Sequence, residues 1–206
     1  MNYCKLYDPP HEGMIARETE HGCEIFQYEG WRPYSMNPYF FGDCEGEYED
    51  ITEEQAEKAQ KEYLKDVGNM LRIAPRLAFE KHHGQRDLGG HPYIEHIERV
   101  ADSVSSAEAQ IIALLHDIVE DTDVTFSDLI KLGFTSAVIY SLKCLTKRDD
   151  EDYFEYIQRV TYSEYAREVK LADLEDNMDM TRLDVVSDKD KERCKKYKKA
   201  YQMLDR

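Results

Sequence analysis

The feature that most constrains the fold is the apolar segment IIALLHDIVED, in which a histidine and an aspartate, His116 and Asp117, stand side by side. Its aliphatic residues cover nearly every side of a helix, so a helix formed here must be buried. An ionised aspartate next to a histidine is costly in such surroundings unless something compensates the charge. A divalent cation is a common compensation for this pair. The alternative, more usual for an isolated His-Asp pair, is hydrogen bonding at a helix end.

Two other segments place similar side chains at the border of apolar helices. In KLADLEDNM, Asp173 follows apolar residues, and Asn177 is four positions later on the same helix face. Asp176 and Asp179 are interpreted as solvated surface residues. His96 lies in the first turns of a helix whose apolar side it borders, within the segment GGHPYIEHIERVA. Together these positions suggest one site assembled from separate helices.

The charge balance and the cysteines indicate a compartment and exclude some partners. The chain of 206 residues carries 27 basic and 43 acidic residues, a net charge of −16. Such a surface repels a phosphate backbone and anionic membranes, so we expect neither nucleic acid nor a membrane as a partner. The N-terminus lacks a secretory signal, and five scattered cysteines without a C-x-x-C pair fit a reducing compartment. The predicted location is cytoplasmic.

The composition divides the chain near residue 50 and predicts a mainly α fold with a small N-terminal β appendage. Residues 1–50 are rich in aromatics and glycine, and they predict short strands over 14–19, 23–28 and 31–34, the last two joined by a turn at Glu29-Gly30. Residues 51–206 form the predicted helical domain. Its helices are expected over 52–65, 68–81, 93–103, 107–121, 127–132, 136–145, 153–160, 163–180 and 188–204.

Three blocks in this order resemble the HD-domain phosphohydrolases. They are KHHGQRDLGGHPYIEHIERVA, ALLHDIVEDTDVT and VKLADLEDNM, and the resemblance covers about residues 68–206. It extends to the RelA/SpoT-type alarmone hydrolases and their small stand-alone relatives. The resemblance implies an all-helical domain with one metal ion, commonly Mn²⁺. No second region resembles the synthetase domain of the long bifunctional enzymes.

The resemblance also assigns roles by position. It implies four metal ligands, His96, His116, Asp117 and Asp173, and an acidic pair that activates water, Glu120 and Asp121. Two imidazoles and two carboxylates suit Mn²⁺, with Fe²⁺, Co²⁺ or Zn²⁺ as possible substitutes. Glu120 is expected to accept the proton of the attacking water.

The predicted substrate contacts are Asn177, Arg193 and Tyr197, which match nucleotide-contacting positions of the family, together with Lys147. Several positions depart from the family pattern: Asp87, Leu88, His91, Leu174 and Asp176 stand where basic residues are frequent or usual. The expected partner is therefore a small phosphorylated nucleotide, with (p)ppGpp losing its 3′-pyrophosphate as the first hypothesis. Two alternatives remain open, a nucleotidase acting on a dNTP or a nucleoside monophosphate, and a non-catalytic module that senses a nucleotide.

Overall fold

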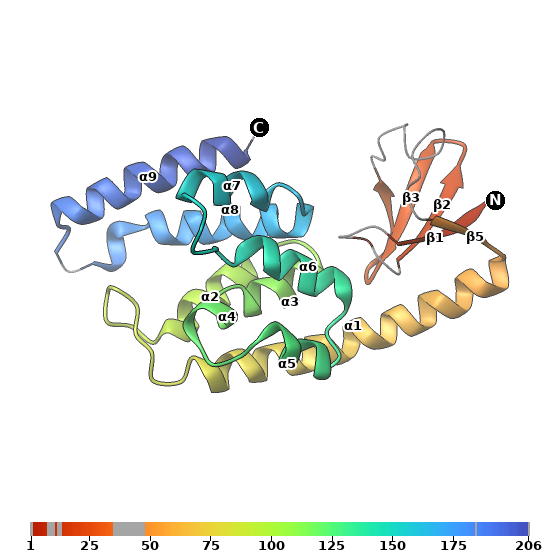
Figure 1. Cartoon of the computed structure of the whole chain (residues 1–206), viewed down its shortest axis with the longest axis horizontal. Coiled ribbons are helices and arrows are strands. Elements are labelled where there is room, and N and C mark those ends of the chain that lie inside the picture. The colour runs from red at the N-terminus through yellow and green to blue at the C-terminus, as the bar shows by residue number, and fades with distance from the viewer. Residues whose placement is uncertain (1, 8–10, 12–13, 35–47, 184, 206) are drawn as a thin grey trace.

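The computed structural model describes residues 2–7, 11, 14–34, 48–183 and 185–205. Figure 1 shows a small sheet at one end and a cluster of helices at the other, with the long helix α1 (Glu53–Lys81) running from one to the other. The mainly α fold with a small N-terminal β appendage is therefore confirmed. Tyr39, Phe40, Phe41 and Cys44, which belong to the predicted aromatic-rich region, lie outside the described residues.

The sheet is antiparallel, and its strands follow the order β4-β3-β2-β1-β5. Their bounds are β1 (Tyr3–Leu6), β2 (Ile15–Thr19), β3 (Gly22–Gln27), β4 (Gly30–Tyr34) and β5 (Tyr48–Ile51). The prediction of β2, β3 and β4 is confirmed, whereas β1 and β5 were missed because four residues carry too little alternation to be recognised. Gln27 pairs with Gly30, so the turn residues are Tyr28 and Glu29 and the predicted Glu29-Gly30 turn is wrong by one position.

Helix α1 begins with a capping box, in which Thr52 and Gln55 bond reciprocally. The sequence predicted two helices here, but the structure has one helix of 29 residues with Pro75 inside it. A proline inside a helix removes one backbone hydrogen bond and costs about 3 kcal/mol, which the packing on both sides of Pro75 offsets. Val67, Met70 and Ala74 before it and Leu77 after it pack in one helical core.

The helix predicted over 107–121 is interrupted where its polar residues stand. Helix α3 (Ala107–Leu115) ends at His116, and α4 (Ile118–Asp121) begins after Asp117. Nδ1 of His116 hydrogen-bonds to the carbonyl oxygen of Ala113. In a continuous helix that oxygen would accept from the backbone N–H four residues later, so this side-chain bond competes with the helix. The break therefore coincides with the two residues that carry the chemistry.

Helix α3 lies at the centre of the helical part and contacts α1, α2, α6 and α8. The remaining helices agree with prediction within about two residues, the usual uncertainty of helix ends: α2 (Tyr93–Asp102), α5 (Phe126–Lys131), α6 (Ser136–Leu145), α7 (Tyr153–Val160), α8 (Glu164–Met178) and α9 (Asp188–Leu204). The N-cap of α9 is Ser187, whose side chain accepts from the backbone N–H of Asp190. Within the described part of the chain, no helix is both long and apolar enough to cross a membrane.

Candidate metal centre

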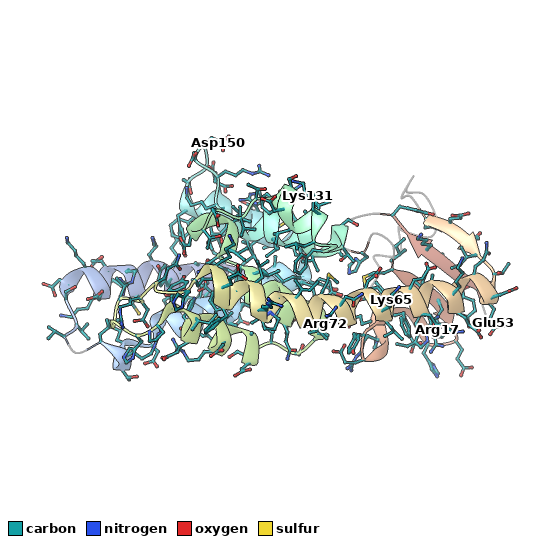
Figure 2. The ribbon with its side chains drawn as sticks, turned by 90° about the horizontal axis from the view of Figure 1, so that it is seen from below. Arg17, Glu53, Lys65, Arg72, Lys131 and Asp150 are labelled. Carbon is teal, nitrogen blue, oxygen red and sulfur yellow. The ribbon has the colours of Figure 1, made fainter. Side chains whose placement is uncertain are left out.

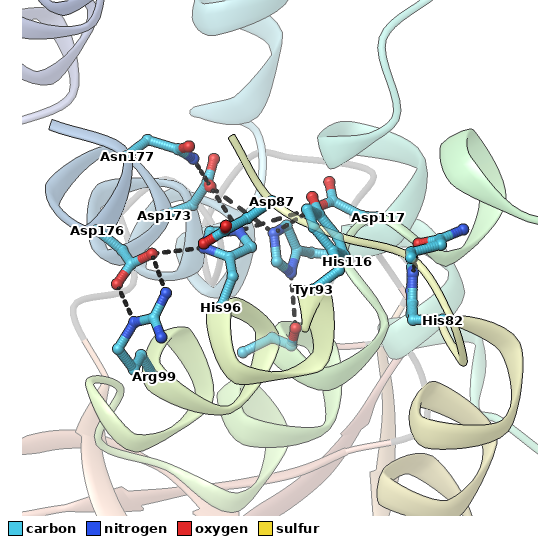
Figure 3. Close-up of polar contacts among 12 residues, drawn as sticks. His82, Asp87, Tyr93, His96, Arg99, His116, Asp117, Asp173, Asp176 and Asn177 are labelled. Atoms are coloured by element: carbon cyan, nitrogen blue, oxygen red, sulfur yellow. Dashed lines mark hydrogen bonds and ion pairs between the residues drawn. The ribbon is translucent and has the colours of Figure 1, made fainter. Parts of the chain in front are cut away.

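Four side chains from three places in the helical part converge in Figure 3: His96 from α2, His116 and Asp117 from the α3–α4 break, and Asp173 from α8. Nε2 of His116 lies 3.0 Å from Oδ2 of Asp117 and 3.8 Å from Oδ1 of Asp173. Nε2 of His96 lies 3.9 Å and 3.3 Å from the same two oxygens. Ligand atoms of His96, His116 and Asp117 all lie within 4.8 Å of one another. The structure thus brings together the four residues predicted as metal ligands.

The partner of each imidazole Nδ1 fixes which nitrogen carries the proton. Nδ1 of His116 lies 2.7 Å from the carbonyl oxygen of Ala113, which only accepts, so Nδ1 donates. Nδ1 of His96 lies 2.6 Å from Oδ2 of Asp176, which also accepts. Both rings therefore direct Nε2 toward the two aspartates, as in histidines that bind a metal.

The chemistry of these donors fits a cation. Nε2 of His116 is buried and has no hydrogen-bond partner among the described residues. A lone pair facing carboxylates is unfavourable unless a positive charge lies between them. Burial disfavours a charged ring, but Asp117 and Asp173 raise the pKa of His116 well above its usual value, so the two carboxylates favour a positive charge at Nε2, whether a proton or a metal ion. Two nitrogens and two carboxylate oxygens suit a divalent metal ion.

Two residues that support this cluster were not predicted from the sequence. The hydroxyl of Tyr93 donates to Oδ2 of Asp117 at 2.5 Å, and Nζ of Lys170 donates to Oδ2 of Asp173 at 2.7 Å. Burial opposes ionisation of Asp173, but Lys170 and the two imidazoles hold its pKa well below the usual range. Spacing could have indicated both residues, because each stands one helical turn before a ligand, Tyr93 before His96 and Lys170 before Asp173.

The predicted catalytic pair lies at the exposed end of α4, one turn beyond Asp117. Oε1 of Glu120 accepts a hydrogen bond of 2.5 Å from the backbone N–H of Lys147. Partial loss of solvent, together with the charge of Asp117, raises the pKa of both Glu120 and Asp121. Lys147 was predicted to contact the substrate. Its backbone N–H donates to Glu120, whereas its ammonium group donates to the carbonyl oxygen of Arg148.

A cavity of about 280 Å³ opens beside the metal-ligand residues, and Tyr93 and His96 form part of its wall. Two predicted substrate contacts, Asn177 and Arg193, also line it. Nδ2 of Asn177 donates to Oδ1 of Asp173 at 2.5 Å, so this amide reaches from the cavity to the ligand set. The cavity therefore adjoins the candidate metal centre at His96 and Asn177.

Tyr197, the remaining predicted substrate contact, is not among the described residues that line this cavity. Its ring packs 6.3 Å from the ring of Tyr153, and the two belong to the packing of α9 against α7. Burial first, then the charge of Asp173, raises the pKa of the Tyr197 hydroxyl. The structure thus places Tyr197 near the ligand set but mainly in packing.

The interpretation of Asp176 as a solvated surface residue is wrong. Its side chain is only 12% exposed and accepts hydrogen bonds from Nδ1 of His96 and from Nε of Arg99, each at 2.6 Å. Nη2 of Arg182 donates to the same carboxylate at 2.9 Å. Asp176 lies near the end of α8, three residues after Asp173, so it faces α2. Helical periodicity alone gave no sign of these partners on other elements.

The histidines and aspartates of three separate segments thus converge on one site, as the resemblance to HD-domain phosphohydrolases implied. No protein-family model matches the chain. Among curated proteins, the chloroplastic RSH1 protein of Arabidopsis thaliana is 34% identical over 103 residues, which is 48% of this chain and 11% of that protein. The bifunctional (p)ppGpp synthase/hydrolase SpoT of Escherichia coli K12 is 36% identical over 83 residues, 38% of this chain and 12% of that protein.

A solved structure supports the same relationship across more of the chain. It is a metazoan ortholog of SpoT, which hydrolyses ppGpp and plays a role in starvation responses. The match has a TM-score of 0.56 and 26% identity, and it covers 66% of this chain and 84% of that one. The present chain is therefore related to the hydrolase domains of the RelA/SpoT type, although its match spans only 11–12% of the two curated relatives.

Proposed function

We propose that this protein is a metal-dependent phosphohydrolase that removes the 3′-pyrophosphate of (p)ppGpp. The observation that carries the proposal is the convergence of two imidazole nitrogens and two carboxylates beside a cavity lined by guanidinium groups. The E. coli and metazoan relatives are both named for hydrolysis of this nucleotide. The relationship and the site chemistry thus support the same reaction.

In this mechanism His96, His116, Asp117 and Asp173 would hold the metal, which would supply Lewis-acid activation of a phosphoryl oxygen and of water. Tyr93 and Lys170 keep the two aspartates oriented through their hydrogen bonds. Glu120, with Asp121 beside it, orients the attacking water and accepts its proton. The raised pKa of Glu120 favours this role, because a general base works best when its pKa approaches the operating pH.

The cavity wall carries three guanidinium groups, and three aspartates, Asp87, Asp179 and Asp190, line it as well. Arg86, Arg182 and Arg193 all line the cavity, and guanidinium groups suit phosphate oxygens. We infer that Arg193 and Asn177 contact the nucleotide, whereas Lys147 acts from the connector beside Glu120. Tyr197 contributes by packing α9 against α7.

One observation favours a second candidate function, a nucleotidase acting on a less charged substrate such as a nucleoside monophosphate or a dNTP. Arg182 already forms ion pairs with Asp87 and Asp176, so part of the positive charge in the cavity is neutralised. Each phosphate group adds negative charge that the wall must compensate. A cavity wall with fewer unpaired guanidinium groups therefore favours a substrate with fewer phosphate groups.

A metal-supplemented turnover assay tests the proposal. Purified protein with Mn²⁺ should convert ppGpp and water to GDP and pyrophosphate, measured by chromatography with separate determination of phosphate and pyrophosphate. An Asp117→Ala preparation purified in parallel controls for contaminating phosphatases. Intact ppGpp alongside hydrolysis of a simple nucleoside phosphate would replace the first candidate with the second. Nucleotide binding without turnover of any substrate would favour a sensing module.

A further inference from the structure

Asp176 occupies the junction between the candidate metal centre and the cavity. One of its oxygens, Oδ2, accepts from Nδ1 of His96 at 2.6 Å, and Oδ1 accepts from Nε of Arg99 at 2.6 Å. Arg182 binds the same carboxylate at 2.9 Å and also donates to the backbone carbonyl of Asp176. Two guanidinium groups thus hold the carboxylate ionised and fixed in orientation, and it only accepts from His96.

Arg182 connects this carboxylate to the loop on the other side of the cavity. Its Nη1 lies 3.2 Å from Oδ2 of Asp87, whose other oxygen accepts the backbone N–H of His91. The loop and the turn after α8 also approach closely at Gly89, where a Cβ atom would lie 2.7 Å from the carbonyl oxygen of Arg182. Figure 3 shows Asp176 with its two partners from α2, His96 and Arg99.

We propose that Asp176 is the positioning residue of His96, holding Nδ1 protonated so that Nε2 remains the metal-binding atom, and that Arg99 and Arg182 fix Asp176 for this purpose. The proposal rests on the proposed metal-dependent function. The two positions at which this chain replaces basic residues of the family with aspartate, Asp87 and Asp176, are both bound by Arg182. The substitutions therefore create a connected set of charges rather than a simple loss of positive charge.

The test compares two charge-removing variants, Asp176→Asn and Asp87→Asn. Each removes one carboxylate partner of Arg182, but only Asp176 contacts His96. The Kd for Mn²⁺ is measured by competition with a fluorescent chelator, and the imidazole ¹⁵N resonances are recorded in the Zn²⁺-loaded protein. Asp176→Asn should weaken metal binding roughly 10–100-fold, the usual effect of mutating the group that supports a metal-binding histidine, because a neutral amide oxygen accepts from Nδ1 less strongly than a carboxylate. It should also shift the His96 resonances, whereas Asp87→Asn should change neither.

Thermal unfolding in chelator separates positioning from general destabilisation. If Asp176→Asn fails to fold, Arg99→Gln provides the second variant, because it removes one support of Asp176 without touching His96, and it should weaken Mn²⁺ binding by a smaller factor. Unchanged Kd and unchanged His96 resonances in a folded Asp176→Asn protein would overturn the proposal, as would equal weakening by Asp87→Asn. If the wild-type protein itself fails to bind any divalent metal, the proposed function fails first.

Discussion

Two buried carboxyl clusters in this molecule are built differently. At the candidate metal centre, Asp173 is 4% exposed and is surrounded by Lys170 and two imidazoles. At the junction of the sheet with the helices, Glu108 of α3 is 5% exposed, but its contacts are the hydroxyl of Tyr63 and the backbone N–H of Tyr28. Oε2 of Glu108 has no hydrogen-bond partner among the described residues. One carboxyl group is surrounded by cations and the other by neutral donors.

The difference shows in the pKa values of the two groups. Burial raises the pKa of Glu108, and the hydrogen bonds from Tyr63 and Tyr28 do not fully reverse the effect. Burial acts on Asp173 in the same direction, but the nearby positive charges hold its pKa well below the usual range. The same helix, α3, therefore ends in a charged cluster suited to a cation and begins beside a carboxyl group that is more easily kept neutral.

The largest expected effect tests the charged cluster. Asp117→Ala should abolish both metal retention and activity, because it removes a ligand and leaves Tyr93 and His116 without their shared partner. Elemental analysis and the turnover assay measure the two effects. Asp149→Ala, a change at an exposed aspartate of the 147–152 connector, is the matched control and should retain both. Stoichiometric metal in Asp117→Ala would show that the ligand set is wrong.

A smaller effect separates catalysis from metal binding within the same cluster. Glu120→Gln should keep the metal and the substrate affinity but lose about 10²–10⁴ in kcat, the usual contribution of a general base. The reason is that the amide still accepts the N–H of Lys147 but cannot take a proton from water. Steady-state kinetics with measured metal content provide the test. Near-normal turnover would remove Glu120 from the mechanism.

The sequence predicted the charged cluster better than it predicted the contacts that support it. The four ligand residues stand at the borders of apolar segments, so burial of unlike polar groups was visible in the pattern. The surroundings of Asp176 were not visible, because Arg99 lies 77 positions away on α2 and Arg182 lies beyond the end of α8, where the helical periodicity stops. Periodicity indicates which face of a helix is buried, but it does not identify the partner of a polar side chain across a helix interface.

The fold shows the same limit on prediction. Most helix bounds follow from capping residues and apolar spacing, and α6 and α7 have the predicted ends. Two predictions failed where tertiary packing decides. Separate helices were expected over 52–65 and 68–81, where α1 is continuous, and one helix was expected over 107–121, where α3 and α4 are separate. Glu108 could not be recognised as a buried residue, since its partners Tyr63 and Tyr28 come from α1 and the sheet turn.

A substitution at Glu108, the buried carboxyl group bound by Tyr63 and Tyr28, should change the stability of the protein rather than its activity. Glu108→Ala leaves the hydroxyl of Tyr63 and the N–H of Tyr28 buried without an acceptor, which costs about 1–3 kcal/mol in the free energy of unfolding. Urea denaturation measures the change, and Mn²⁺ affinity should stay that of the wild type. Glu98→Ala, at an exposed position of α2, should change stability by less than about 0.5 kcal/mol. Loss of metal binding in Glu108→Ala would show that the two clusters are not independent.

The smallest effect concerns the pH dependence contributed by Glu108 alone, compared between the wild type and Glu108→Gln. The glutamine oxygen can still accept from Tyr63 and Tyr28, so the two proteins should have similar stability near pH 4.5, the ordinary pKa of the carboxyl group. Above that pH the unfolded chain loses the proton while the folded protein retains it, because the folded pKa is raised. Wild-type stability should therefore fall relative to the variant as pH rises, and the difference should level off once the pH passes the folded pKa.

Each pH unit between the unfolded and the folded pKa of Glu108 corresponds to about 1.4 kcal/mol in this difference. Comparing two proteins that differ only at residue 108 cancels the contributions of His96 and His116, whose raised pKa values also make stability fall with rising pH. Urea unfolding in chelator between pH 4.5 and 8 gives the two curves. Parallel curves would mean that Glu108 ionises as readily in the folded protein as in the unfolded chain. In that case the pKa of Glu108 would not be raised in the folded protein, and burial beside Tyr63 and Tyr28 would not favour its neutral form.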